Sequence, residues 1–282
     1  MNSFIDMHMH STASDGKDSP SVLLGKIRQM GIRCFSVTDH DTIDGTKEME
    51  QLAVGDDSVH FIRGIEFSCI TPISKCHILG YSYDWDSGAF IEILEKGKTM
   101  RRQKLEQRLM FLRDKYGIVF SNMDLTEMRN MGSVGKPHMA DLMVKMGLAD
   151  SVGEAITKYI NGCPTMESRL PANEVIDAIH AANGISVWAH PLGGVGEQRL
   201  GEELFHEQLK FLMDAGLKGL ECHYSRYNHD EIDFLVNCAN KHGLYISGGS
   251  DYHGRKDYPG IGTLNAESEP IQESEITIMR VV

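Results

Sequence analysis

The sequence of 282 residues is poor in positive charge, with 28 lysine and arginine residues against 40 aspartate and glutamate residues and a formal net charge of −12. A protein surface that follows nucleic-acid phosphates depends on clustered lysine and arginine, because its affinity comes from counterion release. We therefore expect no extended nucleic-acid surface. A small or terminal anionic substrate is compatible with this charge if metal ions supply positive charge locally.

The six cysteines do not form any Cys-x-x-Cys pair. Several of them fall in expected strands or helices, where a free cysteine serves as a small apolar side chain. We expect reduced thiols in a cytoplasmic protein, and no disulfide framework. No secretory signal is expected, because the first residues lack a basic segment followed by a long apolar core. No apolar run reaches the length of a transmembrane helix, so no membrane partner is expected.

Repeats and low-complexity segments are also missing from the sequence. Hydrophobic residues make up 41% of the chain and charged residues 24%, which is ordinary for a soluble globular enzyme. A chain of this length can form one large α/β barrel or two ordinary domains.

Two histidines lie close together in the run Phe4-Ile5-Asp6-Met7-His8-Met9-His10-Ser11. Side chains two apart in a strand point to the same face, so His8 and His10 point together at the end of this run. They are a candidate pair of metal ligands. Two half-buried polar residues at a strand end would give the same pattern, so the interpretation depends on the later strands.

Predicted strands and helices alternate along much of the chain. Further strands are expected at residues 32–38, 59–67, 76–83, 184–189, 217–223 and 244–249. Helices are expected near 20–31, from 44, near 171–182, 201–215 and 228–242. This alternation predicts parallel pairing of the strands. In a parallel barrel the carboxyl ends of the strands meet on one face, where the loops form the active site.

The alternation stops between about residues 87 and 170. A long charged helix is expected at 91–116, followed by shorter helices near 122–131, 136–146 and 151–161. We therefore predict a barrel domain from residues 1–86 and 171–282, and a mostly helical inserted subdomain at 87–170 that caps the substrate. The last twenty or so residues show no strong pattern.

Many of the expected strands end in a histidine or a carboxylate. The residues at these ends include His8, His10, His40, Glu66, His190, Asp251 and His253. Chance is a poor explanation for so many, because the whole chain has 13 histidines. Imidazole and carboxylate ligands without thiolate suit manganese, iron or zinc.

These residues, in this order, resemble the polymerase and histidinol phosphatase (PHP) family. The resemblance rests on the motifs His8-Met9-His10, Thr38-Asp39-His40-Asp41, Gly64-Ile65-Glu66, Ala189-His190-Pro191 and Gly249-Ser250-Asp251-Tyr252-His253. Asp15 and His77 match two further family positions. The stretch Gly135-Lys136-Pro137-His138 is similar to a branch that includes 3′,5′-nucleotide bisphosphate phosphatases and exonucleases that trim RNA from its 5′ end.

The resemblance implies a distorted (β/α)7 TIM-like barrel with a trinuclear metal centre, and we expect two to three divalent ions (Mn, Fe or Zn). By this resemblance the first ion would be bound by His8, His10, Glu66 and Asp251. Glu66 would bridge to a second ion that is also bound by His77 and His190. A third ion would be bound by Asp15, His40 and His253.

The implied reaction uses a metal-bound water and no side-chain nucleophile. The water attacks phosphorus in line with the leaving oxygen, and the metal ions neutralise the other phosphate oxygens. The proton for the leaving group could come from a metal-bound water or from an imidazole. His223 and His229 are candidate donors, and the sequence selects neither.

Residues with a predicted substrate role lie mainly in the insert. Lys136 and His138 open a helix, whose amino terminus favours phosphate; a solvated helix cap is the alternative. In this branch the position of Lys136 is often arginine, whose bidentate fork lysine lacks. Many relatives also carry a basic residue close behind the position of Pro191, which this sequence lacks, and Arg169, Arg199 and Arg226 are candidates to compensate for it. Glu221 either orients a ligand histidine or is an ordinary salt-bridged carboxylate.

The long helix also carries a row of basic residues, namely Arg101, Arg102, Lys104, Arg108 and Arg113. We interpret them as a solvated helical face. A basic rim that guides an oligonucleotide end is the alternative.

The leading functional hypothesis is a metal-dependent phosphomonoesterase acting on a small nucleotide of the 3′,5′-bisphosphonucleotide type. A 5′-3′ exonuclease on short RNA or DNA ends is the main alternative, and histidinol-phosphate phosphatase is another. A non-catalytic binding module is disfavoured, because all nine expected ligand positions carry competent residues.

Overall fold

The computed structural model describes residues 3–195, 199–256 and 258–282. Seven strands lie side by side in the order β1 (Ile5–Asp6), β2 (Cys34–Val37), β3 (His60–Ile70), β4 (Lys75–Tyr81), β6 (Ile185–Ala189), β7 (Gly219–Tyr224) and β8 (Tyr245–Gly249). The short strand β5 (Leu170–Pro171) pairs with β3 outside this order.

The two outer strands of this order approach each other. The backbone N–H of Met7, just after β1, donates to the carbonyl of Gly248 in β8 at 3.1 Å, and Met9 forms a parallel bridge with Tyr252. This approach needs glycine at 249, since a Cβ there would overlap the side chain of His8. The strands therefore form a nearly closed barrel, and the predicted seven-stranded α/β barrel is confirmed.

The expectation of parallel pairing throughout is wrong for one strand. β4 is antiparallel to both of its neighbours, β3 and β6, whereas the other pairs in the barrel are parallel. Residues 71–74 connect β3 to β4, with the Thr71 N–H donating to the Ser74 carbonyl at 2.9 Å. A connection this short makes a hairpin, because a parallel crossover needs a dozen residues or more. β4 consequently begins at the face where the parallel strands end.

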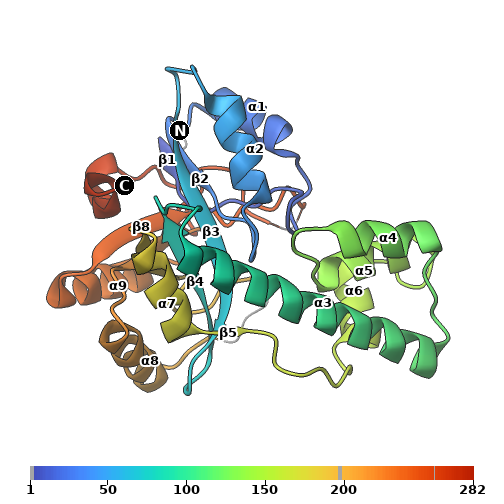
Figure 1. The fold of residues 1–282 in the computed structure, drawn as a ribbon. Helices are drawn as coiled ribbons and strands as arrows, with labels where there is room; N and C mark the ends of the chain where they lie inside the picture. Colours follow the sequence, from blue (N-terminus) through green and yellow to red (C-terminus); the bar gives the residue numbers. More distant parts are fainter. Residues whose placement is uncertain (1–2, 196–198, 257) are drawn as a thin grey trace.

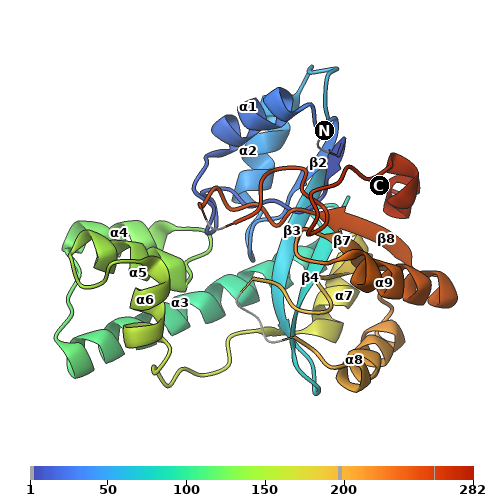
Figure 2. The same cartoon turned by 180° about the vertical axis from the view of Figure 1, so that it is seen from behind.

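Helices pack on the outside of the barrel (Figures 1 and 2). They are α1 (Pro20–Met30), α2 (Asp44–Ala53), α7 (Ala172–Ala181), α8 (Glu202–Asp214) and α9 (His229–His242). The predicted ends of α1 are confirmed: the Ser19 hydroxyl accepts the N–H of Val22, and Gly31 closes the helix with a φ of 74°. Trp188 of β6 stacks on Phe205 of α8, with ring centroids 5.3 Å apart, in the main core.

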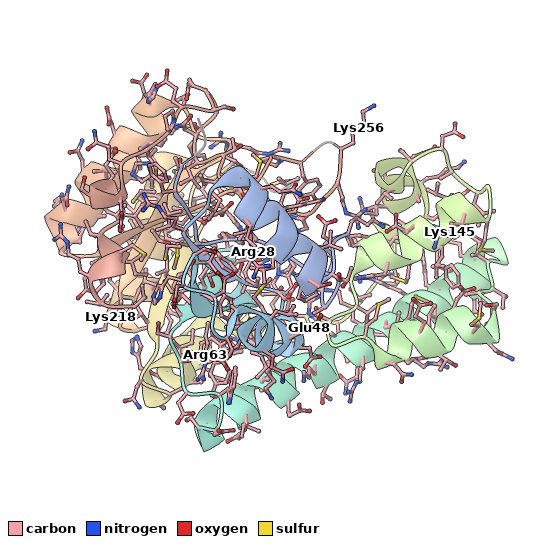
Figure 3. All side chains as sticks on the ribbon, turned by 90° about the horizontal axis from the view of Figure 1, so that it is seen from above. Arg28, Glu48, Arg63, Lys145, Lys218 and Lys256 are labelled. Atoms are coloured by element: carbon pink, nitrogen blue, oxygen red, sulfur yellow. The ribbon has the colours of Figure 1, made fainter. Side chains whose placement is uncertain are left out.

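The region predicted as an insert is helical. It comprises α3 (Gly88–Tyr116), α4 (Asn122–Asn130), α5 (Lys136–Lys145), α6 (Val152–Ala155) and the π-helical turn η1 (Ile156–Ile160). α3 extends away from the barrel, and α4–α6 lie against its far part (Figure 1). Buried side chains of this region, among them Leu105, Leu112 and Met143, form a core of their own. Seen from above, Lys145 lies on this helical region and Lys218 on the opposite side of the molecule (Figure 3). The domain boundaries themselves stay a prediction.

The segment after β8 contains two short 3-10 turns, η2 (Glu273–Glu275) and η3 (Thr277–Arg280). Ile276 and Ile278 are buried against Ile5, Leu79 and other residues of the barrel strands. Two isolated apolar residues do not form a periodic pattern, so the sequence did not predict that this segment packs against the barrel. Within the ranges the structure describes, no helix has both the length and the apolarity needed to cross a membrane.

Candidate metal centre

One end of the barrel carries all nine side chains predicted as metal ligands. His8 and His10 follow β1, His40 follows β2, Glu66 is in β3 and His77 is in β4. His190 follows β6, and Asp251 and His253 follow β8, while Asp15 lies in the loop before α1. Seven of the nine line a pocket of about 110 Å³, and His8 and His10 lie beside it, in contact with Glu66 and Asp251.

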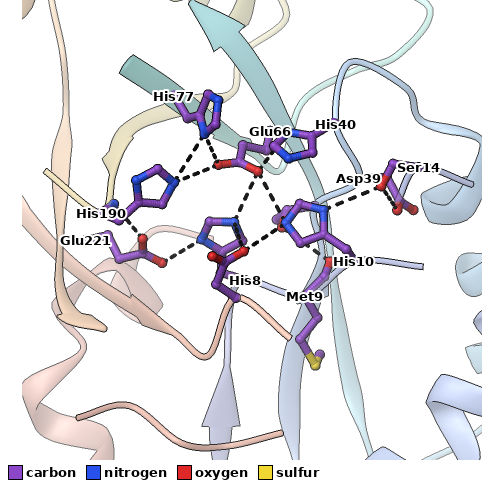
Figure 4. A network of polar contacts seen from close by, with 12 residues as sticks. His8, Met9, His10, Ser14, Asp39, His40, Glu66, His77, His190 and Glu221 are labelled. Atoms are coloured by element: carbon purple, nitrogen blue, oxygen red, sulfur yellow. Dashed lines mark hydrogen bonds and ion pairs between the residues drawn. The ribbon is translucent and has the colours of Figure 1, made fainter. Parts of the chain in front are cut away.

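Glu66 lies among the imidazoles of the predicted ligands (Figure 4). Its Oε2 is 3.3 Å from His8 Nε2, 3.2 Å from His10 Nε2 and 3.0 Å from His40 Nδ1. Its Oε1 is 2.9 Å from His77 Nδ1 and 3.1 Å from His190 Nε2. A single carboxylate is therefore surrounded by five imidazoles from four parts of the chain, since His8 and His10 belong to the same segment.

Several of these buried atoms have no hydrogen-bond partner among the described residues. They are Nε2 of His8, Nε2 of His10, Nδ1 of His40, Oε2 of Glu66 and Oδ1 of Asp15. Leaving a buried polar atom unsatisfied costs about 1–3 kcal/mol, so a native site of this kind calls for a ligand. Lone pairs of nitrogen and oxygen that face one another fit a bound cation.

Among the described residues there are three groups of side chains in which the potential ligand atoms all lie within 4.8 Å of one another. The groups are His10, Asp15, His40 and His253; His8, His10 and Glu66; and His40, Glu66 and His77. The ligand sets predicted for the three ions overlap with these groups. The difference is that His10 also belongs to the group with Asp15, and His40 also belongs to the group with Glu66 and His77. The assignment of ligands to individual ions stays a prediction.

The protonation states of the carboxylates and of His40 suit metal binding, which requires deprotonated ligands. Burial raises the pKa of the Glu66 carboxyl, but the imidazoles of His40, His77 and His8 lower it more, so its pKa lies well below its usual range. Burial also lowers the pKa of His40 to about 3, in spite of Glu66 and Asp15, so this imidazole is neutral.

His10 differs from His40 in this respect. Burial lowers its pKa, but the carboxylates of Asp251 and Glu66, each 3.2 Å from its Nε2 atom, raise it more, to about 10. Without a cation, the negative field of the carboxylates therefore holds a proton on His10. A metal ion must displace this proton, so we expect metal binding to weaken as the pH falls.

Two of the predicted ligands have an uncommon backbone conformation. His190 has a φ of 30° and Asp251 a φ of 57°, in the left-handed region that residues other than glycine seldom adopt. Strain of this kind occurs where the surrounding structure fixes a side chain for function. Here it turns both side chains into the pocket directly after their strands.

Other buried groups hold the predicted ligands from behind. Oε1 of Glu221 is 2.9 Å from His8 Nδ1, and its Oε2 accepts the backbone N–H of His190 at 2.7 Å. Of the two roles that the sequence left open for Glu221, this geometry fits the orientation of a ligand histidine. The Tyr224 hydroxyl donates to Oδ2 of Asp251 at 2.8 Å.

Sequence reasoning did not find Tyr224 or Tyr258. Tyr224 is the last residue of β7, three residues after Glu221, so its position at a strand end was an available signal. Tyr258 lines the pocket, with its ring 4.5 Å from that of His253. It lies in a loop without a local pattern, and no sequence signal identifies it.

Neither candidate proton donor lies at the pocket. His223 is buried in β7, where burial lowers its pKa in spite of the charges of Glu275 and Asp233, and His229 is exposed at the start of α9 beside Glu269. Neither side chain is therefore placed to protonate a leaving group. Simple alternation would put His223 on the same face as Glu221, two residues earlier, but a bulge between these two residues shifts the alternation, so that Glu221 and Tyr224 face the site and His223 does not.

The three residues predicted to bind substrate phosphate lie outside the pocket. His138 Nδ1 accepts the backbone N–H of Gly135 at 2.9 Å, so Nε2 carries the proton and donates to the Ser14 carbonyl at 2.6 Å. Both nitrogens of this ring are thus engaged within the protein. Lys136 Nζ donates to Asn161 at 2.7 Å, and Arg169 pairs with Glu167 at 3.3 Å.

The basic residues of α3 divide between two faces of the helix. Arg102 and Arg113 are exposed, as the interpretation of a solvated face requires. Arg108 is only 8% exposed, so this interpretation is wrong for that residue. Arg101, Lys104 and Arg108 are three and four positions apart and therefore share one face of the helix. This face points inward.

No family model matches the sequence. The chain is 28% identical over 254 residues to the 5′-3′ exoribonuclease of Haemophilus influenzae, covering 88% of this chain and 89% of the relative. It is 27% identical over 287 residues to the 3′,5′-nucleoside bisphosphate phosphatase of Chromobacterium violaceum, covering 98% of each.

Solved structures share the fold. A protein from Bifidobacterium adolescentis, named as a metal-dependent phosphoesterase, superposes with a TM-score of 0.81 at 23% identity, over 99% of this chain and 96% of the other. An amidohydrolase from Chromobacterium violaceum, with bound sulfate and no metal, gives a TM-score of 0.83 at 24% identity, over 99% and 95%.

Proposed function

Given that this chain is a PHP-like metal-dependent phosphoesterase related to 5′-3′ exoribonucleases and to a 3′,5′-nucleoside bisphosphate phosphatase, we propose that it hydrolyses a phosphomonoester of a small nucleotide-like substrate. The substrate in this proposal is of the 3′,5′-bisphosphonucleotide type. One phosphate is bound at the pocket and hydrolysed there, and the second is bound by basic residues of the helical region.

The observation that carries the proposal is the position of Glu66 among five imidazoles with unsatisfied atoms. We assign the nine predicted side chains as the ligands of two to three divalent ions of manganese, iron or zinc. Such ions, when bound, supply an activated water and neutralise the charge of phosphate oxygens. The low pKa of the Glu66 carboxyl and the neutral His40 support this assignment.

The residues behind the ligands prepare the site for a cation. With Glu221 as acceptor of the Nδ1 proton of His8, the Nε2 lone pair of that ring is directed to the side of Glu66. With Tyr224 donating to Oδ2 of Asp251, the Oδ1 atom faces His10 at 3.2 Å. Both contacts fix the orientation of a ligand before any substrate arrives.

Basic residues of the helical region support a second phosphate. Burial lowers the pKa of the Lys104 amine to about 8, with a further contribution from Arg108 and Arg169. Burial likewise lowers the pKa of Arg108 to about 10, and the nearby cations Arg101 and Arg169 add to the effect. Burial also lowers the pKa of Lys136, and the charges of Arg108 and Arg169 lower it further.

These cations are close together in a protein whose net charge is −12. Two carboxylates offset them in part: Asp41 forms an ion pair with Arg101, and Glu167 pairs with Arg169 at 3.3 Å. The buried Arg108 forms no hydrogen bond or ion pair with any described residue. A buried charge without a partner is costly, so an anion in this region would stabilise it.

A specific observation also favours the exonuclease as a second candidate. The inward-facing cations of α3 run from Arg101 to Arg108, which is about 10 Å along a helix that rises 1.5 Å per residue. A row of this length could bind more than one phosphate of an oligonucleotide. One of the relatives described above is a 5′-3′ exoribonuclease.

The test is phosphate release by the metal-loaded protein from 3′,5′-bisphosphonucleosides, 5′-phosphorylated RNA oligomers and histidinol phosphate. We expect release from the bisphosphonucleosides, and a kcat/KM roughly tenfold or more lower in Lys136→Ala, because hydrogen bonds to charged groups contribute about 1.5–3 kcal/mol. Arg102→Ala, on the exposed face of α3, is the matched control and should keep the wild-type kcat/KM.

Two results would overturn the proposed substrate. Cleavage of the oligomers alone would reject the small substrate in favour of the second candidate. Release from histidinol phosphate alone would show that the basic residues of the helical region do not select a second phosphate.

A further inference from the structure

Two loops of the candidate metal centre are in contact with the helical region. The first contact joins α5 to the loop that carries Asp15. His138 Nε2–H donates to the carbonyl of Ser14, the residue directly before Asp15, at 2.6 Å. The Nδ1 atom of the same ring accepts the N–H of Gly135 at 2.9 Å, which fixes the tautomer and the ring orientation.

Asp141 lies one turn after His138 and extends this contact. Its Oδ2 accepts from Lys17 Nζ at 2.5 Å and from Arg255 Nη2 at 3.4 Å. Arg255 also donates to the carbonyl of Asp15 at 3.2 Å. Two side chains on one face of α5 therefore hold both sides of Asp15 as well as the loop that follows His253.

The second contact joins α3 to the loop that carries His40. Arg101 forms an ion pair with Asp41, the residue after His40, and donates to the Ser68 hydroxyl at 2.8 Å. Asp41 is 3% exposed and has a φ of 50°, and its N–H donates to the Glu66 carbonyl at 2.9 Å. Its Oδ1 accepts the N–H of Ser68 at 2.9 Å. Arg101 thus stabilises a backbone turn that directs His40 into the pocket.

Four of the other predicted ligands, Glu66, His77, His8 and His190, are fixed by the barrel itself. Glu66 and His77 are within paired strands, and Glu221 of β7 supports His8 and His190. Asp15, in contrast, lies in a loop without regular secondary structure, with 17% of its side chain exposed. A loop side chain must be ordered by other contacts to bind a metal with a fixed geometry, since its conformational entropy opposes binding.

We propose that the helical region positions Asp15 and His40, so that the metal position formed by Asp15, His40 and His253 depends on the docking of α3 and α5. His138 and Arg101 are positioning residues in this proposal, which rests on the metal centre of the proposed function. The metal position around Glu66, His77 and His190 does not depend on the docked helices.

The experiment is to count bound metal ions and to measure their affinities in His138→Ala. Metal content per chain is measured after gel filtration with a limited supply of Mn²⁺, and the affinities are measured by calorimetric titration. We expect one class of site to lose affinity roughly tenfold or more, as occurs when a supporting residue of a metal ligand is removed, while the other class is unchanged.

Lys145→Ala is the matched control, because Lys145 is exposed on the same helix of the helical region (Figure 3). The Lys145→Ala variant should bind metal at every site with the affinity of the wild type. Asp141→Asn is a milder second variant. The Asp141 side chain is 23% exposed, and the substitution removes its charge while keeping its size, so no buried cavity forms. It should weaken the same class of site in the same direction.

Two outcomes would overturn the inference. In the first, both His138→Ala and Asp141→Asn bind metal as the wild type does. In the second, the folded variants lose every class of site equally. If the wild-type protein bound no divalent metal, the proposed function would fail together with this inference. Absence of phosphate release with a selective loss of one class of site would count against the substrate alone.

Discussion

Glu221 lies behind His8, with its Oε1 atom 2.9 Å from the Nδ1 atom of the imidazole. The opposite nitrogen, Nε2, is 3.3 Å from Oε2 of Glu66 and 3.6 Å from Oδ1 of Asp251. The three carboxylates come from β7, β3 and the loop after β8. This arrangement fixes which nitrogen of His8 faces the candidate metal centre.

Replacing Glu221 should therefore weaken metal binding without removing a ligand. We expect Glu221→Ala to lower metal affinity or kcat about 10- to 100-fold, because the acceptor for His8 and the backbone N–H of His190 is lost. Glu221→Gln keeps the shape of the side chain and should have a smaller effect. Metal titration of both variants is the measurement, and equal affinities in wild type and Glu221→Ala would contradict the prediction.

The Tyr224 hydroxyl gives a second prediction of this type. Tyr224→Phe removes the donor to Oδ2 of Asp251, a hydrogen bond to a charged group that contributes about 1.5–3 kcal/mol. We expect metal affinity to fall roughly tenfold. Tyr83→Phe is the control, since the Tyr83 hydroxyl is also buried but donates to the Gly64 carbonyl instead of to a ligand. The prediction is wrong if both variants change metal affinity to the same extent.

Removal of metal should lower the stability of the folded protein. Ions that bind only the folded state at 100 times their dissociation constant add about 2.7 kcal/mol per site. A chelator should therefore lower Tm, and Mn²⁺ should restore it. Glu66→Gln should lose much of this response, because it removes the charge shared by the five imidazoles. Thermal unfolding with and without Mn²⁺ is the measurement, and identical Tm values for the wild type would count against a metal centre.

Lys104 should make substrate binding dependent on pH. Burial, with Arg108 and Arg169, lowers the pKa of its amine to about 8. Only the protonated amine attracts phosphate, so KM should rise as the pH increases through about 8. In Lys104→Arg the side chain stays charged over this pH range, so KM should no longer rise with pH. KM measured between pH 7 and 9.5 for both proteins tests this, and parallel profiles would exclude Lys104 from the phosphate site.

Local sequence signals predicted several parts of the fold. Ser19, Pro20 and Gly31 define both ends of α1, because capping depends on the side chains at those positions alone. The spacing of His8 and His10 placed both on one side of their strand, and the two imidazoles have ring centroids 5.2 Å apart. Signals of this kind are short-range, and a single sequence contains them.

The direction of β4 was not available from such signals. A strand has the same alternation in either direction, and the sequence does not state which neighbour it pairs with. The end of β3 could not be predicted either. The expected strand ended at residue 67, directly after Glu66, whereas β3 continues to Ile70 as part of the hairpin with β4. His77 reaches the pocket from the beginning of its strand only because β4 is antiparallel.

The sequence by itself determined the residue types and their local spacing, and hence the candidate ligands and the chemistry they favour. Only the tertiary structure decided that Glu66 is shared by five imidazoles, that His138 donates a hydrogen bond to Ser14, and that His223 does not line the pocket. The reason is that local periodicity orients a side chain relative to its own strand or helix. Distances between side chains depend on how distant strands and helices pack together.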